Sequence, residues 1–524
     1  MSSNRTGEAV YTRLTEDSDD AVEISTPDTR SGNVGNYSAA VDAAGFGRFH
    51  AMLLLVCGWA NMSDTVEILS VSFLLPQASR DMHISNTEKG VLNSIIFVGM
   101  LVGGYCWGSL ADVQGRRQVL MYSLACNALF GFLSSLCQQF PVFLMMRFLS
   151  GVGVGGSIPV IFSYFGEFQP SDRRGAMISA LATFWMFGNI LTAALAWAVI
   201  PRQHLGFHSP EGFSYESWRI FIALCCIPAA SSVLTFLVMP ESPKYLLEKG
   251  KSEEALQIMR KIHQWNNPTR NQDDYPINHL VASSKEEKMV MSSNGRSAAT
   301  GRCGRIRVII ETTSQLFKGP QIRVTAAMLT ITFCLSFGFY GLWMWFPEIF
   351  NRVEHAGSAC GDYNPDSPES LANDTDDNIY RDGFYTSLSN LPGNLLTIFL
   401  MDRLGRKFML TTSLILSGVS VFLIWFLQTR TQVLATSIVF GAISVVSWNT
   451  LSVMGVEMYP TNCRTTALGV QSVVNRTAAI LGNLLFGVLI ELHCSVPMIL
   501  IAAMLAAGGL VTVLLPNTTR IELK

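Results

Sequence analysis

Long apolar runs with few charges restrict the fold of this chain more than any other feature of its sequence. A helix needs about 20 apolar residues to cross the hydrocarbon core of a membrane, and in lipid it satisfies its own backbone hydrogen bonds. Runs near this length fall at residues 51–79, 90–112, 119–138, 141–166, 176–200, 218–239, 323–347, 384–401, 408–428, 432–456, 465–490 and 496–515. The sequence therefore predicts an all-α membrane protein with twelve transmembrane helices in two six-helix halves.

Basic residues cluster in the short loops on one side of these predicted spans. Lys and Arg are enriched in cytosolic loops of membrane proteins, so we expect this side to face the cytosol. Both termini and the linker at 241–322 would then be cytosolic, and the loop at 351–382, with eight acids and two arginines, would lie on the opposite side. The basic positions are Arg116, Arg117, Arg173, Arg174, Arg403, Arg406 and Lys407.

Composition divides the chain into five segments. Residues 1–47 hold eight acids among Ser, Thr, Gly and Asn, and are expected to form a disordered cytosolic tail without a cleavable signal peptide. The predicted halves occupy 48–240 and 323–516, with a linker at 241–322 whose first part has helical periodicity. We expect residues 517–524 to form a second cytosolic tail.

Several function classes find no support in the sequence. The segment GVGVGG at 151–156 lacks the Lys-Ser/Thr of a phosphate-binding loop, so ATP-driven pumping is not indicated. A net charge of −2 does not favour a nucleic-acid partner. Most of the 11 cysteines lie within predicted spans and form no zinc pattern, so we expect no metal site. No sequence motif indicates an enzyme or a bound cofactor, and we expect neither. On the non-cytosolic side, Asn373 is placed for glycosylation, and Cys360 and Cys494 are either bridged or reduced, depending on the compartment.

The loops show that the two halves are copies of one another. ADVQGRR and MDRLGRK repeat an acid, a glycine and an arginine at an offset of 290 positions, and GEFQPSDRR and VEMYPTNCR repeat a glutamate and an arginine at the same offset. We expect the acids and arginines to form ion pairs between helix ends that act as gates, Asp112 with Arg174 or its neighbours and Asp402 with Arg464. The alternative is that the loops only set topology. The gate candidates are Gly108, Asp112, Gly115, Arg116, Arg117, Glu167, Arg174, Asp402, Gly405, Arg406, Glu457 and Arg464.

Two acids, Asp64 and Glu67, lie near the middle of the first predicted span. Three residues apart on a helix, they share a face, and each charge at the bilayer centre costs about 2.5 to 3.5 kcal/mol. They either hydrogen-bond to neighbouring helices as part of the packing, or line a cavity that binds a cation, a proton or a hydroxylated substrate. Arg476 in a late span needs an anion, which could be one of these acids, another carboxylate or a substrate group.

Aromatic and polar side chains mark further helix faces. Trp185 and Asn189 lie four residues apart in the fifth span, Trp448 and Ser452 four residues apart in the tenth, and Tyr340 is in the seventh. Such stripes serve packing at least as often as ligand binding. Together with Asp64, Glu67 and Arg476, these residues are the candidates for substrate binding.

Several motifs resemble those of the major facilitator superfamily. GSLADVQGRR matches its loop motif between the second and third helices, and RFLSGVGVGG and PESPKYL look like its sugar-porter branch. MSDTVEI, FYGLWMWFPEI, SWNTLSVMGVEMYP and RTTALG together resemble the synaptic vesicle glycoprotein 2 family, from Gly45 to Leu515. The resemblance implies that Trp185 and Trp448 line a central cavity, that a basic residue belongs at Arg476, and that the membrane is that of a vesicle.

The chain departs from that family pattern in two places. About 32 residues at 351–382 stand where vertebrate members have a large lumenal domain, and Ser452 stands where the family has an aspartate. The favoured function is secondary transport of a small polar solute, sugar-like or an organic ion, by alternating access with coupling to protons, in a synaptic or secretory vesicle membrane or the plasma membrane. The alternative is a regulatory protein that no longer transports and acts on vesicle-fusion proteins through its N-terminal tail.

Overall fold

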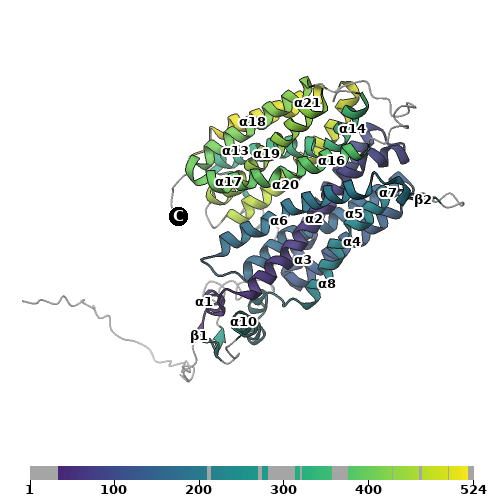
Figure 1. The fold of residues 1–524 in the computed structure, drawn as a ribbon. Coiled ribbons are helices and arrows are strands. Elements are labelled where there is room, and N and C mark those ends of the chain that lie inside the picture. The colour runs from purple at the N-terminus through teal and green to yellow at the C-terminus, as the bar shows by residue number, and fades with distance from the viewer. Residues whose placement is uncertain are drawn as a thin grey trace, which may run out of the picture.

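The computed structural model describes residues 34–208, 214–268, 274–280, 313–314, 316–318, 321–356, 376–427, 429–459, 463–493 and 495–516. Within these residues the chain forms two bundles of helices packed side by side (Figure 1). The glycosylation site predicted at Asn373, the cysteine pair predicted at Cys360 and Cys494, and residues 1–33 and 517–524 lie outside the described residues.

Each half is a bundle of long helices. The N-terminal half contains α2 (Arg48–Asp81), α3 (Asn86–Gln114), α4 (Arg116–Leu136), α5 (Phe140–Glu167), α6 (Arg174–Val199), α7 (Ser217–Cys225) and α8 (Ile227–Val238). The C-terminal half contains α13 (Gln321–Trp343), α14 (Phe346–Ala356), α16 (Asp376–Leu388), α17 (Asn390–Leu404), α18 (Arg406–Phe426), α19 (Arg430–Glu457), α20 (Arg464–Leu492) and α21 (Ser495–Thr512). The predicted all-α membrane fold is confirmed.

Eleven candidate spans of sufficient length and apolarity are present in the described part of the chain. Helices α7 and α8 together make one of them, Ser217–Val238. The eighth predicted span, at 384–401, is instead divided between α16 and α17, which are separated at Ser389. Neither piece reaches the length of a span alone, and Pro392 at the start of α17 lacks the backbone N–H that a continuous helix would use there.

Glycines make the sharp turns between paired helices. Gly115 separates α3 from α4 with φ 104°, and Gly405 separates α17 from α18 with φ 86°. L-residues with a side chain rarely adopt these angles, so the two positions require glycine. The tight turns predicted from the repeated loop motif are therefore present in both halves. We call this end of the molecule the motif end.

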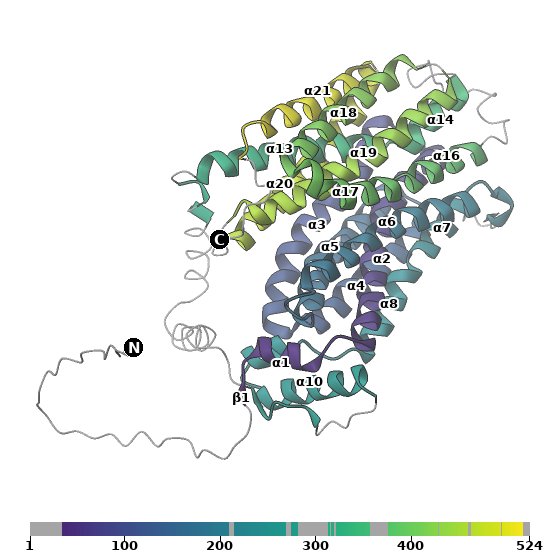
Figure 2. The ribbon, with the colours of Figure 1, turned by 60° about the vertical axis from the view of Figure 1, so that its left-hand side comes forward.

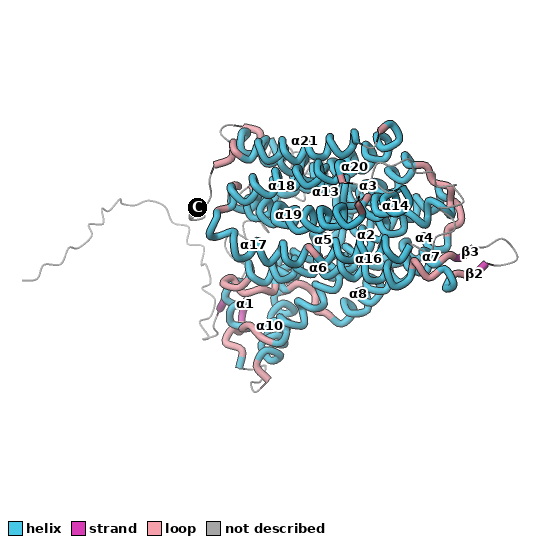
Figure 3. The backbone as a smooth tube through the Cα atoms, turned by 45° about the horizontal axis from the view of Figure 1, so that its top comes forward, coloured by secondary structure: helices cyan, strands magenta, loops and turns pink. Residues whose placement is uncertain are grey.

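A small subdomain lies against the motif end of the N-terminal half. It contains β1 (Val34–Gly35), which pairs in parallel with β4 (His279–Leu280), and the helices α1 (Tyr37–Ala44), α9 (Pro243–Glu248) and α10 (Ser252–Asn266). A separate hairpin pairs β2 (Phe207–His208) with β3 (Ser214–Tyr215) after the 3-10 turn η1 (Gln203–Leu205). Figure 3 shows β2 and β3 beyond one end of the long helices and the other short strands next to α1.

The N-terminal tail is ordered closer to its start than the sequence indicated. Residues 34–44, placed in the disordered tail, form β1 and α1 because α1 buries Ala40, Val41 and Ala44. The Tyr275 hydroxyl donates to the carbonyl of Ala40 at 2.6 Å, and the Asn266 amide donates to that of Gly45 at 2.8 Å. Helices α9 and α10 lie in the first part of the linker, where the sequence has helical periodicity.

The two halves touch at one end and diverge at the other. Added Cβ atoms on Gly90 of α3 and Gly487 of α20 would lie 3.3 Å and 2.9 Å from the Cα of the other glycine. Five helical turns away, Gly108 and Gly469 lie on the same faces of the same helices, where an added Cβ would meet nothing within 4 Å. The halves therefore separate toward the motif end, as the diverging ribbons of Figure 2 also suggest.

Candidate functional site

Glu67 of α2 is held within the N-terminal half by Arg147 of α5. Its Oε1 accepts a hydrogen bond from Arg147 Nη1 at 2.6 Å and another from the Ser150 hydroxyl. Arg147 also donates to Ser70 at 3.2 Å, and both charged side chains are fully buried. This pair places Glu67 in a structural contact between α2 and α5. Sequence reasoning did not identify Arg147 as the partner, although the arginine begins the RFLSGVGVGG motif.

Asp64, one turn away on α2, has a different environment. The Ser157 hydroxyl of α5 lies 2.8 Å from Oδ1 and 2.7 Å from Oδ2, and the Asn127 side chain of α4 faces the same carboxyl group. No described Lys, Arg or His nitrogen makes a salt bridge with it. Asp64 is 0% exposed, and the cation within electrostatic reach is Arg476 of the other half.

Arg476 connects the two halves. It lies on α20, is partly exposed, and its Nη1 lies 3.3 Å from the Met100 sulfur of α3. It interacts electrostatically with Asp64 across the interface and with the Tyr340 hydroxyl of its own half. Of the partners that the sequence left open for Arg476, the structure favours Asp64 over Glu67.

An aromatic cluster surrounds Tyr340. Its ring centroid lies 4.9 Å from that of Phe97 of α3 and 5.9 Å from that of Trp448 of α19. Phe339 contacts both Tyr340 and Trp448, at 5.2 Å and 5.9 Å, and stacks on Trp343. Tyr340 and Trp448 are only partly buried. The structure thus brings two predicted aromatic residues together, beside Arg476.

The remaining candidates lie on α6 and α19. Asn189 is 4% exposed and Trp185 is partly buried. Between them, Gly188 packs so tightly on α2 that an added Cβ would lie 2.7 Å from Cβ of Thr65, the residue after Asp64. Ser452 is exposed and donates to the carbonyl of Trp448 at 2.9 Å. Asp64, Arg476, Tyr340 and Trp448 are therefore joined by contacts or electrostatics, whereas Trp185, Asn189 and Ser452 flank them.

The ion pairs at the motif end differ from those expected. Arg116 Nε pairs with Glu167 at 3.3 Å, and Arg406 Nε pairs with Glu457 at 3.4 Å, so the pairing repeats at the offset of 290.

The arginines of the expected pairs have other partners: Arg174 donates to the carbonyl of Gln169, and Arg464 to that of Tyr459. Asp112 is exposed and forms no ion pair within the described residues, and the side chain of Asp402 lies outside the described residues. The expected Asp112–Arg174 pair was therefore wrong for this conformation, because each helix-end arginine faces a carbonyl of its own loop.

The repeated loop also contacts the linker. Arg117 donates from its backbone N–H to Glu241 at 3.0 Å and from Nε to the carbonyl of Phe236 at 2.8 Å. Arg116 reaches Glu248 of α9 at 3.7 Å, and Ser242 donates to Glu167. These contacts lie within the N-terminal half and its linker and involve no residue of the C-terminal half.

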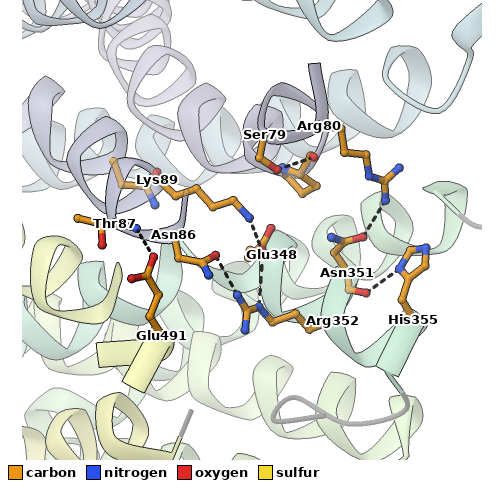
Figure 4. Close-up of polar contacts among 12 residues, drawn as sticks. Ser79, Arg80, Asn86, Thr87, Lys89, Glu348, Asn351, Arg352, His355 and Glu491 are labelled. Atoms are coloured by element: carbon orange, nitrogen blue, oxygen red, sulfur yellow. Dashed lines mark hydrogen bonds and ion pairs between the residues drawn. The ribbon is translucent and has the colours of Figure 1, made fainter. Parts of the chain in front are cut away.

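At the opposite end, which we call the lock end, buried charges join the two halves (Figure 4). Lys89 Nζ at the start of α3 lies 2.8 Å from Glu348 Oε1 of α14, and both side chains are buried. Arg352 lies 3.4 Å from the same oxygen and donates to Asn86 at 3.0 Å. Glu491 accepts from the backbone N–H of Thr87 at 3.1 Å. Burial alone would raise the pKa of Glu348, but Lys89 and Arg352 hold it below its ordinary value of 4.5.

Comparisons with known proteins agree with this architecture. Residues 50–321 match the family described as "Sugar (and other) transporter", and residues 383–523 match the Major Facilitator Superfamily. Synaptic vesicle glycoprotein 2C of Mus musculus is 33% identical over 92% of this chain and 80% of its own length. Synaptic vesicle glycoprotein 2A of Homo sapiens is 32% identical over 92% of this chain and 79% of its own. The chain belongs to the synaptic vesicle glycoprotein 2 family of the major facilitator superfamily.

Solved structures with the same fold include the xylose transporter XylE from E. coli. Its partially occluded inward-open conformation gives a TM-score of 0.66, with 16% identity, over 93% of this chain and 100% of that chain. Its inward-open conformation gives a TM-score of 0.64 at 17% identity, over 90% and 97%. The likeness supports the fold. This member of the synaptic vesicle glycoprotein 2 family is a multi-pass membrane protein with a transporter fold.

Proposed function

We propose that the chain is a secondary transporter that moves a small polar solute, together with a proton, through a site between its halves. The observation that carries the proposal is Asp64, which is buried, contacts no cation among the described residues and interacts with Arg476 of the other half. Acids inside membrane spans are costly and usually mark ion or substrate pathways. An acid at the junction of two halves that rock against one another can couple the binding of a proton to that rocking movement.

The candidate residues take distinct roles in this proposal. Asp64 exchanges the proton, with the Ser157 hydroxyl as its hydrogen-bond partner. Arg476 binds an anionic or hydroxyl group of the solute and attracts Asp64 when that acid is ionised. Tyr340 and Trp448 offer aromatic faces on which a sugar-like or organic-ion solute can pack. Glu67 is a positioning residue, because Arg147 already balances its charge.

Alternating access follows from the two ends of the molecule. The lock end is closed by Lys89 and Glu348, and the motif end is open between Gly108 and Gly469. Because basic loops favour the cytosol, we place the motif end there, so that this conformation faces the cytosol. The vesicle membrane is the proposed location because the relatives are synaptic vesicle glycoproteins.

A proteoliposome uptake screen of sugars and organic ions, with an imposed pH gradient, tests the proposal. We expect Asp64→Asn to abolish the dependence of uptake on the gradient, and Arg476→Ala to reduce uptake by at least about 10²-fold if it contacts a charged group of the solute. Asp172→Asn, an exposed acid in a loop, is the matched control and should transport normally. Gradient-driven uptake that survives Asp64→Asn would contradict the coupling role.

A regulatory function remains the second candidate. Residues 1–33 contain seven acids, and the chain that follows them is fixed to the linker by β1 and α1. This anchoring places Val34, where the described chain begins, beside the motif end. Pull-downs with residues 1–46 test this candidate. Specific capture of a vesicle-fusion protein, without uptake of any solute in the screen, would favour regulation over transport.

A further inference from the structure

A groove opens beside the subdomain at the motif end, away from the site between the halves. It has a volume of about 650 Å³ and lies between the start of α2, the end of α8 and α10. Its walls are mainly apolar and include Phe49, Val238, Ile258 and Trp265, and Lys261 and Gln264 add polar atoms. Figure 2 shows α10 lying crosswise under the ends of the N-terminal helices.

The groove continues a surface that faces lipid. Along α8, Leu234, Leu237 and Val238 share one outward face and are 66%, 55% and 80% exposed. A transmembrane helix exposes such side chains to hydrocarbon, so acyl chains cover this face in the membrane. Val238 is the last residue of α8 and also lines the groove, so the lipid-facing side of α8 is continuous with the groove.

The groove also carries the residues that anchor proteins at a lipid headgroup layer. Trp265 is 50% exposed, its ring contacts Phe49 at 5.8 Å, and tryptophan is enriched at this depth. Lys261, one turn earlier on α10, is exposed and forms no ion pair within the described residues. An ammonium at the mouth of an apolar groove complements a phosphate above an acyl chain.

We propose that this groove binds one anionic phospholipid, with its phosphate at Lys261 and the upper part of an acyl chain against Val238 and Trp265. The site is separate from the solute site: its residues come from α2, α8, α10 and the segment after it, whereas Asp64 and Arg476 lie mid-span on α2 and α20. A bound lipid would fix α10 to the membrane surface and with it the linker that contacts the repeated loop.

Fluorescence quenching in nanodiscs tests the proposal on the full chain. The probes are brominated phosphatidylserine and brominated phosphatidylcholine, whose bromines quench nearby tryptophans, and Trp265→Phe isolates the contribution of Trp265. We expect phosphatidylserine to quench this contribution at a lower mole fraction than phosphatidylcholine does. Lys261→Gln should raise the half-saturating fraction of phosphatidylserine about fivefold, the effect of one basic residue near an anionic surface.

Two controls make the result specific. Lys251→Gln removes a lysine near the other end of α10 that pairs with Glu254 at 2.9 Å, and should leave quenching unchanged. Inorganic phosphate should not displace the lipid; displacement would mean that the site binds free phosphate. Equal quenching by the two lipids, or an unchanged midpoint in Lys261→Gln, would overturn the proposal.

Discussion

Arg147→Leu is expected to destabilise the protein by about 3 to 5 kcal/mol, because it leaves the carboxylate of Glu67 buried without its cation. Glu67 is 1% exposed, and of the contacts described above only the Ser150 hydroxyl would remain to it. Reversible unfolding in mixed micelles, or the loss of monodisperse protein on heating, would show the change. Leucine fills much of the vacated volume, so the lost ion pair accounts for most of the expected effect.

The double variant Glu67→Gln, Arg147→Leu separates charge from packing. Without the unpaired carboxylate, it should recover most of the lost stability. Arg173→Leu provides a control, because Arg173 is exposed and pairs with Asp172 at 3.7 Å, an arrangement that contributes little. If Arg147→Leu were as stable as this control, Glu67 would not depend on Arg147, and its assignment as a positioning residue would fail.

Glu348→Gln should open the lock end. The variant leaves Lys89 and Arg352 facing one another in a buried interface without a carboxylate, which costs the present conformation about 3 to 5 kcal/mol. Opening that end exposes both cations to water, so the cost is avoided in the other conformation. The equilibrium constant between the two conformations should change by about 10²-fold or more in favour of the one whose motif end is closed. Distances between spin labels at the two ends of α3 and α20 would measure the shift.

Glu491→Gln is the matched variant at the same end. Glu491 is exposed and accepts a hydrogen bond from Thr87, so its loss should change the spin-label distances little. A similar response of the two variants would mean that the buried ion pair does not hold the lock.

The pH response of the lock follows from the direction of the pKa shift. The pKa of Glu348 is lower in this conformation than its ordinary value of 4.5, so the carboxylate stabilises the closed lock above that value and loses the effect as the pH falls through the lowered pKa. Acidification from about pH 7 to about pH 5 should therefore leave the lock closed. Opening of the lock end in this range would show that another group titrates there.

The sequence predicted the elements well because hydropathy is a local property. The spans and the glycine turns at Gly115 and Gly405 follow from runs and motifs that need no tertiary information. The lock could not be found in this way. Lys89 and Glu348 each lie one residue outside a predicted span, 90–112 and 323–347, so their position in the sequence does not indicate that they are buried. Their burial arises only when the two halves pack together.

The site was predicted in part. An acid inside a span must avoid lipid, so the burial of Asp64 and Glu67 follows from their position. Which cation each faces depends on the rotation of α2 against α5 and α20, which a single sequence does not report. The motif end shows the same limit: Arg116 pairs with Glu167 and Arg406 with Glu457, whereas the pairs expected from the sequence involved Asp112 and Asp402.

Rocking of the halves is the central claim, and cross-linking Gly108→Cys to Gly469→Cys tests it most directly. These residues lie five turns from the touching pair Gly90 and Gly487 and meet nothing within 4 Å here. With Cys106, Cys303, Cys360 and Cys494 replaced by serine, we predict that a disulfide forms slowly in proteoliposomes and much faster when Glu348→Gln is added. No disulfide in either protein, with Ser94→Cys and Ile480→Cys cross-linking readily at the lock end, would contradict alternating access.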